Sequence, residues 1–212
     1  MMPSQRWLFE RQIKAAQAAA KVLSLHNAVI FDTETTGLST QTDKIVEIAA
    51  INLTGDVLLN LRLDPQMPMP EKAESIHHIS DEMLVGQPTF KQAFAQISAA
   101  LHGKHWIIYN YDFDHELIVS EAWRAFRKNS LISPASDGKK CAMKMFASFY
   151  GDYSDYHGSF TWQKLTRAAD YFGVEVAAPP HSALGDCLRT LGVLRGMSAW
   201  LDQPILKELI AC

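Results

Sequence analysis

The chain is predicted to fold as one α/β domain, and three observations lead to this prediction. First, three strand-like segments follow one another through short polar links, which is typical of an antiparallel meander. Second, the later part of the chain alternates short apolar strands with amphipathic helices, as in the strand–helix units of α/β proteins. Third, 212 residues are enough to bury one sizeable core.

Composition and charge narrow the classes of function. The chain is 48% hydrophobic and 20% charged, as ordinary globular proteins are, and its formal net charge is −3. A protein that grips long duplex through its phosphates is usually basic, so any contact with nucleic acid is expected to be local, short or metal-mediated. Three widely spaced cysteines predict a reducing compartment, the cytoplasm, and no disulfide framework or structural zinc. No apolar run approaches the length of a membrane span, and no signal peptide is visible.

A basic helix is expected over residues 3–25. Apolar positions recur there at near-helical spacing among Arg and Lys, and Glu10 is the only acid. A transit peptide has the same bias. The simpler interpretation is a helical extension, residues 1–26, that packs on the main domain, residues 27–212. Its exposed basic face is a candidate surface for a protein partner.

Three strands are expected at residues 28–34, 44–53 and 57–63. A short polar link with a Gly, Thr54–Asp56, joins the last two strands as a hairpin requires. Glu47 lies within the second strand. We expect it to face solvent, although it is also a candidate fifth member of an acidic site.

The middle of the chain begins with an irregular crossing loop, because Pro65, Pro68 and Pro70 break any regular pattern. Ser80 can cap a helix that starts directly after it. Apolar spacing then predicts a helix over residues 89–101, a buried strand over residues 105–109 and a helix that begins after Asn110.

The last third of the chain is expected to be mainly helical. Residues 141–150 should form a short strand and then a helix, and residues 151–158 a solvated, mobile loop by composition. Two further helices are expected: residues 161–172, capped by Thr161 and closed by Gly173, and residues 183–200, with Ser182 as N-cap.

Two acids end the first strand. Asp32 and Glu34 are two positions apart, so on a strand they point to the same face with Cα atoms roughly 7 Å apart. An isolated Asp-x-Glu pair is more often a solvated strand end than a site. The alternative is a site for a hard divalent cation, which prefers carboxylate oxygens.

More acids stand where later elements begin. Asp112 and Asp114 lie between a strand and a helix, where open α/β sheets bind ligands. Asp186 lies in the first turn of the last helix, where the helix dipole favours the ionised form, and His181 precedes it by five residues. Each alone is more often structural than functional, but together they form a specific pattern.

This pattern resembles that of the DEDD exonuclease superfamily over roughly residues 27–198. The resemblance is to its histidine-type branch, to which proofreading exonuclease subunits of bacterial DNA polymerase III belong. Three motifs carry it: Phe31–Leu38, Asn110–Asp114 and His181–Asp186.

The family's motifs also choose between neighbouring residues. The metal-binding Asp of the second motif follows an aromatic residue, which selects Asp114, after Phe113, over Asp112. The other branch of the superfamily carries Tyr where this chain has Ser182, whereas His181 fits the histidine type.

The resemblance implies an RNase H-like fold with a mixed five-stranded sheet. It also implies a 3′–5′ exonuclease that releases nucleoside 5′-monophosphates, with single-stranded DNA 3′ ends favoured, as in proofreading or DNA repair. Two divalent cations, Mg²⁺ or Mn²⁺, would activate a water and stabilise the leaving oxygen. His181 would be the general base, since an imidazole with a pKa of about 6.5 can accept a proton near neutral pH. The implied metal ligands are Asp32, Glu34, Asp114 and Asp186.

By the same resemblance, Glu34 and Thr35 contact the terminal nucleotide. The segment Ile76–Asp81 resembles the family's His-Gly-Ile segment, which implies that His77 lies at the substrate. His78 replaces the family's Gly. Joint zinc ligation by the two neighbouring histidines is not expected, because adjacent side chains diverge.

Other functions stay open at this point. An exoribonuclease acting on short or 3′-end RNA would differ in the polar groups that meet the sugar 2′-hydroxyl. A nucleic-acid-binding module would keep the fold without catalysis, and a structural ion site would not need His181. The short stretch after the last helix, residues 201–212, favours a free-standing enzyme, or one joined to a polymerase or another partner through the N-terminal helix.

Overall fold

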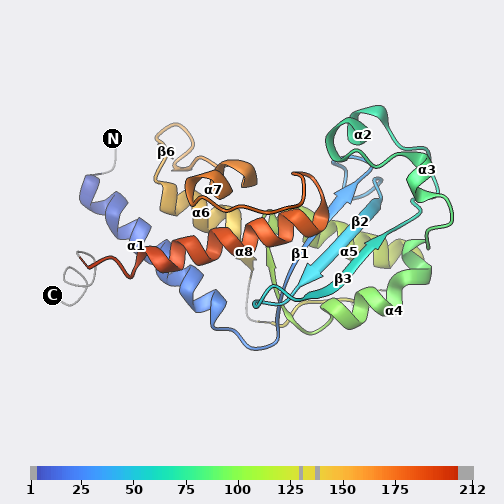
Figure 1. Ribbon diagram of the computed structural model, residues 1–212, viewed down its shortest axis with the longest axis horizontal. Helices are drawn as coiled ribbons and strands as arrows, with labels where there is room; N and C mark the ends of the chain where they lie inside the picture. Colours follow the sequence, from blue (N-terminus) through green and yellow to red (C-terminus); the bar gives the residue numbers. More distant parts are fainter. Residues whose placement is uncertain (1–3, 129–130, 137–138, 205–212) are drawn as a thin grey trace.

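A five-stranded sheet forms the centre of the computed structural model, which describes residues 4–128, 131–136 and 139–204 (Figure 1). The strand order is β3-β2-β1-β4-β5. The sheet is mixed, because β1, β2 and β3 pair antiparallel whereas β1, β4 and β5 run parallel. The predicted meander and mixed five-stranded sheet are therefore confirmed. The strands are β1 (Ala28–Thr35), β2 (Ile45–Ile51), β3 (Val57–Arg62), β4 (His105–Ile108) and β5 (Lys140–Cys141).

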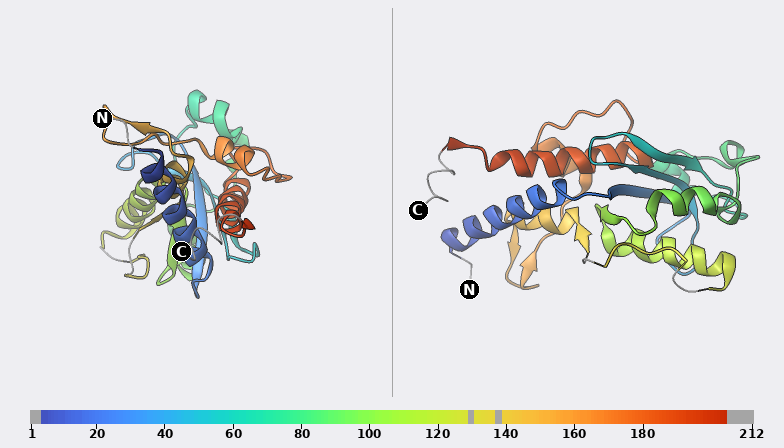
Figure 2. Two further views of the ribbon diagram at one scale, coloured as in Figure 1. Left: turned by 90° about the vertical axis from the view of Figure 1, so that its left-hand side faces the viewer. Right: turned by 90° about the horizontal axis from the view of Figure 1, so that it is seen from below.

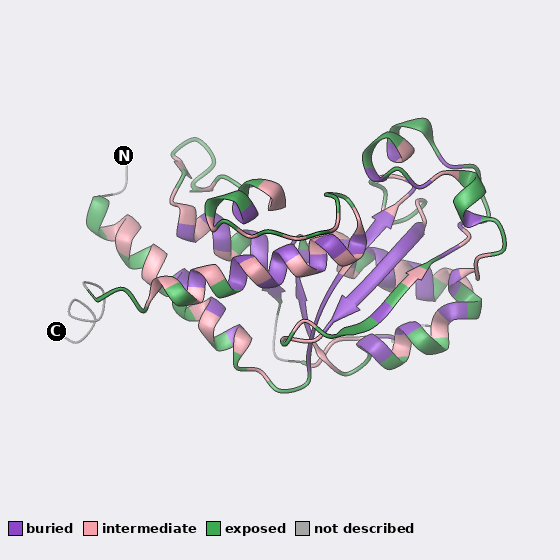
Figure 3. Cartoon of the chain, viewed as in Figure 1, coloured by how far each residue is buried: buried purple, intermediate pink, exposed green. Residues whose placement is uncertain are grey.

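Strand β1 lies in the middle of the sheet. Val29, Ile30 and Phe31 are fully buried, so the strand is apolar on both faces up to Asp32. Figure 3 shows β1 and β2 almost wholly buried, whereas the edge strand β3 exposes much of its length. The acids thus begin at the point where the apolar run of the central strand ends.

Helices cover both faces of the sheet (Figure 2). On one face, α8 (Ala183–Trp200) packs on β1 and β2, and the Cys187 thiol donates to the backbone carbonyl of Ala49. On the other face lie α4 (Phe90–Leu101) and α5 (Tyr111–Phe126), where Trp106 bridges Phe31 and His115 of α5. Phe31 faces α5 through Trp106, so Asp32, the next residue along the strand, points to the opposite face, toward α8.

The N-terminal helix, α1 (Gln5–Leu23), belongs to the main hydrophobic core. Its buried stripe lies against α6 (Ala142–Tyr150) and α8, and consists of Ala15, Ala16, Ala19 and Val22. The predicted packing of this helix on the domain is confirmed, and the division of the chain at residue 26 stays a prediction. In the parts of the chain that the structure describes, no helix has the length and apolarity that crossing a bilayer requires.

Two expected starts of helices are confirmed. The short α3 (Asp81–Leu84) follows Ser80, and α4 follows Thr89, whose hydroxyl accepts from the Gln92 backbone in a capping box. A third helix, α2 (Glu71–His77), lies in the predicted crossing loop, and here the prediction was wrong. Pro70 stands at its N-cap, where its fixed φ favours a helix start and its missing N–H costs nothing.

Two segments near the C-terminal third also differ from expectation. The helix predicted from Thr161 is shorter, α7 (Leu165–Tyr171), because the preceding residues are held extended by a bond from the Tyr109 hydroxyl to the Gln163 carbonyl at 2.8 Å. The predicted solvated loop contains a hairpin of β6 (Tyr153–Ser154) and β7 (Ser159–Phe160). Composition missed it because Trp7 of α1 stacks on Phe160, a contact distant in sequence.

Gly192 lets α8 approach the segment after α7. A Cβ at Gly192 would lie 2.4 Å from Cγ1 of Val174. We expect Gly192→Ala to lower the free energy of unfolding by about 1–2 kcal/mol, although Ala is favoured over Gly within helices by about 1 kcal/mol. Urea denaturation measures the change. The double variant with Val174→Ala should recover part of the stability that Gly192→Ala loses. If the losses of the two single variants add up in the double variant, the result would contradict this account.

Candidate active site

Three elements bring the predicted acids together. Asp32 and Glu34 lie at the end of β1, Asp114 in the first turn of α5 and Asp186 in the first turn of α8. Glu34 and Asp114 are only 8% and 4% exposed. Burial raises the pKa of Asp32, and the nearby negative charges of Asp114, Asp186 and Glu34 raise it further, so the four carboxylates lie near one another.

The pKa values of these acids show that their burial and proximity disfavour the charged forms. Burial raises the pKa of Asp32 well above its ordinary value, and the neighbouring acids raise it further. Burial, followed by Asp186 and Glu47, raises the pKa of Glu34 to about 8. Burial raises the pKa of Asp114 to about 7, even though the Thr33 hydroxyl donates to Asp114 Oδ1 at 2.6 Å. Without a cation, these carboxyl groups retain protons near neutral pH. A bound cation would stabilise their ionised forms.

The donor set fits a hard metal ion. One ligand atom each from Glu34, His181 and Asp186 lies within 4.8 Å of the others, and this group is the one of its kind among the described residues. Carboxylate oxygens with an imidazole at the rim are suitable ligands for divalent cations. The predicted metal ligands and His181 therefore meet at one site.

His181 lies on an exposed loop before α8. Its φ is +57°, a left-handed conformation that is uncommon for a residue other than Gly. Ser182 is the N-cap residue as predicted, but its hydroxyl does not cap the helix and instead donates to the Pro179 carbonyl at 3.0 Å.

The side chain of Glu47, rather than that of Ser182, accepts a hydrogen bond from the start of α8. The backbone N–H of Ala183 donates to Glu47 Oε2 at 2.8 Å, and Arg62 pairs with Glu47 Oε1 at 3.4 Å. The expectation that Glu47 faces solvent was wrong, because it is 8% exposed and pairs with Glu34 across the sheet. The antiparallel pairing explains this position, because residues directly opposite each other on neighbouring strands lie on the same face of the sheet.

Asp112 lies outside the cluster, as the motif predicted. It is paired with Lys139 and Lys144, each at 2.6 Å, on the surface. Hydrogen bonds from these two lysines lower the pKa of Asp112 to about 2. The structure therefore separates the two acids of this motif into a buried Asp114 and an exposed, ion-paired Asp112.

A cavity of about 460 Å³ adjoins the acids. The end of β1 and the turn that follows it, Thr33 to Leu38, form one wall, and α2 with Pro70 and Phe113 forms the rest. His77 lies in this wall and is 7% exposed, and its Nδ1 accepts from the Ile79 amide at 3.1 Å. His78 adopts a φ of 58°, so it takes the left-handed conformation that a Gly adopts easily.

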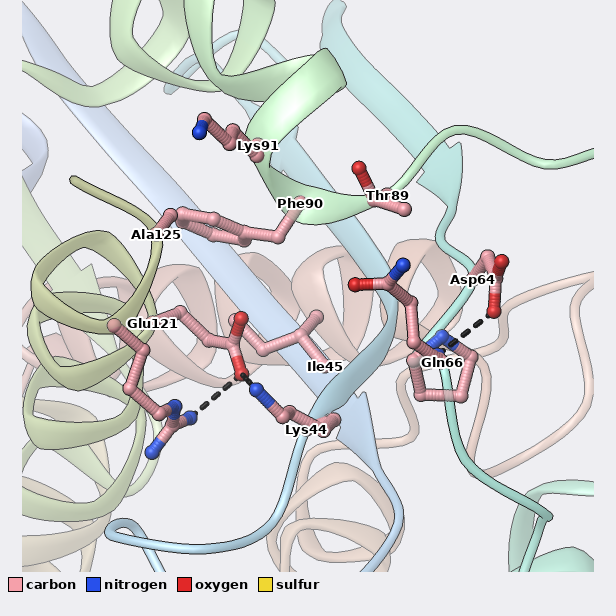
Figure 4. Close-up of a pocket in the computed structure, with 11 residues that line it drawn as sticks. Lys44, Ile45, Asp64, Gln66, Thr89, Phe90, Lys91, Glu121 and Ala125 are labelled. Atoms are coloured by element: carbon pink, nitrogen blue, oxygen red, sulfur yellow. Dashed lines mark hydrogen bonds and ion pairs between the residues drawn. The ribbon is translucent and has the colours of Figure 1, made fainter.

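Hydrogen bonds from a side chain of α5 hold the loop that follows β1. Arg124 of α5 donates to the carbonyls of Thr40, Gln41 and Asp43. Glu121 lies between Arg124 and Lys44, at 2.6 and 3.5 Å, in a second cavity of about 240 Å³ (Figure 4). This network fixes one end of the loop that forms the wall of the 460 Å³ cavity.

A family model described as exonuclease matches residues 29–194. The chain belongs to this exonuclease family. The resemblance seen in the sequence is thereby confirmed, and the protein is a nuclease that hydrolyses nucleic acid from an end. An uncharacterised exonuclease of Escherichia phage 186, CP81, is 34% identical over 86% of this exonuclease and 93% of the relative. The DNA polymerase III subunit epsilon of Treponema pallidum is 32% identical over 47% of this exonuclease and 49% of its own length.

Solved structures share the fold. Exonuclease X, in complex with 5′ overhanging duplex DNA, matches with a TM-score of 0.58 at 21% identity, over 83% of this exonuclease and 93% of that chain. E. coli Exonuclease I, in complex with a dA16 oligonucleotide, matches with a TM-score of 0.65 at 17% identity. The match covers 86% of this exonuclease and 42% of that chain. The predicted α/β exonuclease fold is therefore confirmed.

Proposed function

We propose that this exonuclease removes nucleotides one at a time from the 3′ end of single-stranded DNA and releases nucleoside 5′-monophosphates. The observation that carries the proposal is the meeting of four carboxylates from β1, α5 and α8 with His181, next to a cavity large enough for a nucleotide. The proposed metal ligands are Asp32, Glu34, Asp114 and Asp186, for two Mg²⁺ or Mn²⁺ ions.

The residues divide the chemistry between them. Two bound cations supply Lewis acidity for the attacked phosphate and for the departing 3′-oxygen. His181 accepts the proton of the attacking water, and its place on an exposed loop gives it access to that water. Glu34, Thr35 and His77 line the cavity and hold the terminal nucleotide in position.

The choice of DNA is supported by the relatives. The solved structures of Exonuclease X and E. coli Exonuclease I hold DNA, and the Treponema relative is named for a DNA polymerase. Action on 3′ ends of RNA is the second candidate, since the polar residues that line the cavity, among them Glu34 and Thr35, are able to bond a sugar 2′-hydroxyl. A catalytically silent binding module is a weaker candidate, because it would not need a clustered base and four acids.

Partner and location follow from the same proposal. The face of α1 opposite its buried stripe carries exposed Lys14 and Lys21, which suits an acidic surface of a polymerase subunit or another protein. Cys141 and Cys187 are free and buried, in keeping with work in the reducing cytoplasm. Co-purification of the full chain with a polymerase subunit would test the first point.

One assay tests the reaction and the substrate. Purified protein with Mn²⁺ is given 5′-labelled single-stranded DNA, duplex DNA and RNA of one sequence. We expect stepwise shortening from the 3′ end, fastest on single-stranded DNA. His181→Ala should lower the rate by about 10²–10⁴-fold, whereas His157→Ala, on the exposed hairpin, should keep it. A wild-type protein that leaves all three substrates intact overturns the proposal, and faster loss of RNA selects the second candidate.

A further inference from the structure

Arg189 is a buried cation next to the proposed metal ligands. It is 7% exposed and lies on α8, one turn after Asp186. Its Nη1 donates to Asp186 Oδ1 at 2.9 Å and to the Pro179 carbonyl at 3.0 Å, and its Nη2 donates to the Ala178 carbonyl. One guanidinium thus joins a carboxylate of the site to two carbonyls of the loop that carries His181.

The neighbouring residues make room for this contact. A Cβ on Gly185 would lie 2.7 Å from Arg189 Nη1 and 3.0 Å from the Pro179 carbonyl oxygen. A Gly within a helix costs about 1 kcal/mol relative to Ala. The guanidinium and the loop therefore occupy the space that a side chain at position 185 would fill, and the sequence places a Gly there.

The loop itself needs an outside restraint. His181 sits in the left-handed region, and Pro179 and Pro180 supply no N–H for bonds within the loop. The Asp186 amide donates to the Ser182 carbonyl at the end of the loop, and the bonds from Arg189 tie the first residues of the loop, Ala178 and Pro179, to α8. A planar guanidinium can hold several acceptors in a fixed geometry, which an ammonium cannot.

We propose that Arg189 is a positioning residue that clamps the loop of residues 178–182 onto α8, so that His181 faces Glu34 and Asp186. By donating to Oδ1 of Asp186, Arg189 also orients that carboxylate and leaves its other oxygen for a cation. The inference rests on the proposed function in assigning His181 the role of base. The clamp itself is a property of the metal-free protein.

Arg195 offers a matched control on the same helix. It also donates from Nη2 to two backbone carbonyls, Leu53 at 3.0 Å and Thr54 at 3.2 Å, at the turn between β2 and β3. It is exposed, and both of these bonds go to backbone carbonyls away from the proposed site. Arg195→Ala therefore removes two guanidinium-to-carbonyl bonds from the same helix, at its exposed surface and away from the site.

The first arm of the test measures the loop without any metal or substrate. Hydrogen–deuterium exchange of the backbone amides in residues 178–183 is compared between wild type, Arg189→Ala, Arg189→Lys and Arg195→Ala. Both Arg189 variants should exchange faster there, and Arg195→Ala should match wild type. Arg189→Lys fills most of the volume and keeps the charge, so it decides the question if Arg189→Ala does not fold.

The second arm measures kcat and KM on single-stranded DNA with Mn²⁺. Arg189→Ala should lower kcat by about 10²-fold with little change in KM, as expected for a misplaced base. Added guanidinium should restore about tenfold of kcat to Arg189→Ala and none to His181→Ala. Unchanged exchange in residues 178–183, or a kcat no lower than that of Arg195→Ala, overturns the clamp. A wild type without activity overturns the proposed function instead, and the exchange arm still decides the clamp.

Discussion

Asp114→Asn is expected to lower the rate of 3′-end degradation by about 10³-fold, about 4 kcal/mol of transition-state stabilisation, whereas Asp112→Asn should stay within about twofold of wild type. The two acids are two residues apart at the start of α5, yet only Asp114 is buried in the cluster of carboxylates. Asn keeps the shape of Asp114 and its bond from Thr33 but removes the charge that would hold a cation. Single-turnover degradation of labelled single-stranded DNA at saturating Mn²⁺ measures the difference.

The same substitution should stabilise the metal-free protein. Asp114 is the first of the charges that raise the pKa of Asp32, after burial itself. Asn at position 114 removes that repulsion, so urea denaturation in EDTA should show a free energy of unfolding higher by about 1 kcal/mol. Asp112→Asn instead loses two surface ion pairs and should change stability little. Equal loss of activity in both variants, or lower stability of Asp114→Asn in EDTA, would contradict the assignment of Asp114 as a ligand.

The metal-free protein should lose stability as pH rises from about 6.5 to about 8. In this range the folded state still holds protons on Asp114, with a pKa of about 7, and on Glu34, with a pKa of about 8. The unfolded chain has already lost them, because ordinary carboxyl groups titrate near pH 4. Stability falls with rising pH wherever the folded state binds more protons than the unfolded chain, by about 1.4 kcal/mol per pH unit for each carboxyl that is protonated only in the folded state.

Two histidines set the lower limit of the pH range in which stability falls. Burial lowers the pKa of His77 and His115, so unfolding takes up protons below pH 6.5 and opposes the carboxylate effect there. Chemical denaturation in EDTA at half-unit pH steps measures the slope. Mn²⁺ at about 100 times its Kd should add about 2.7 kcal/mol at pH 8 and remove the decline. Asp114→Asn should show a shallower decline in EDTA, and a metal-free stability that rises between pH 6.5 and 8 would rule out the clustered acids as its cause.

Local sequence patterns predicted the elements whose causes are local. The strands β1, β2 and β3 follow apolar runs and a Gly-containing link, and α4 follows apolar residues at helical spacing. The helix α2 was missed because seven residues give too little periodicity after a run of prolines. The β6–β7 hairpin was missed because its stability comes from Trp7, far away in the chain.

The acidic site likewise has features that the sequence predicts and features that it does not. Motifs in the sequence predicted the residues of the proposed site, because Asp32, Glu34, Asp114, His181 and Asp186 stand at the ends of predicted elements. The contacts that hold these residues in place are visible only in the folded chain. Glu47 meets the Ala183 amide across 136 positions of the chain, and Arg189 ties the His181 loop to Asp186 through carbonyl groups that every residue has. Backbone acceptors leave no mark in a sequence, so such restraints become visible only once the chain is folded.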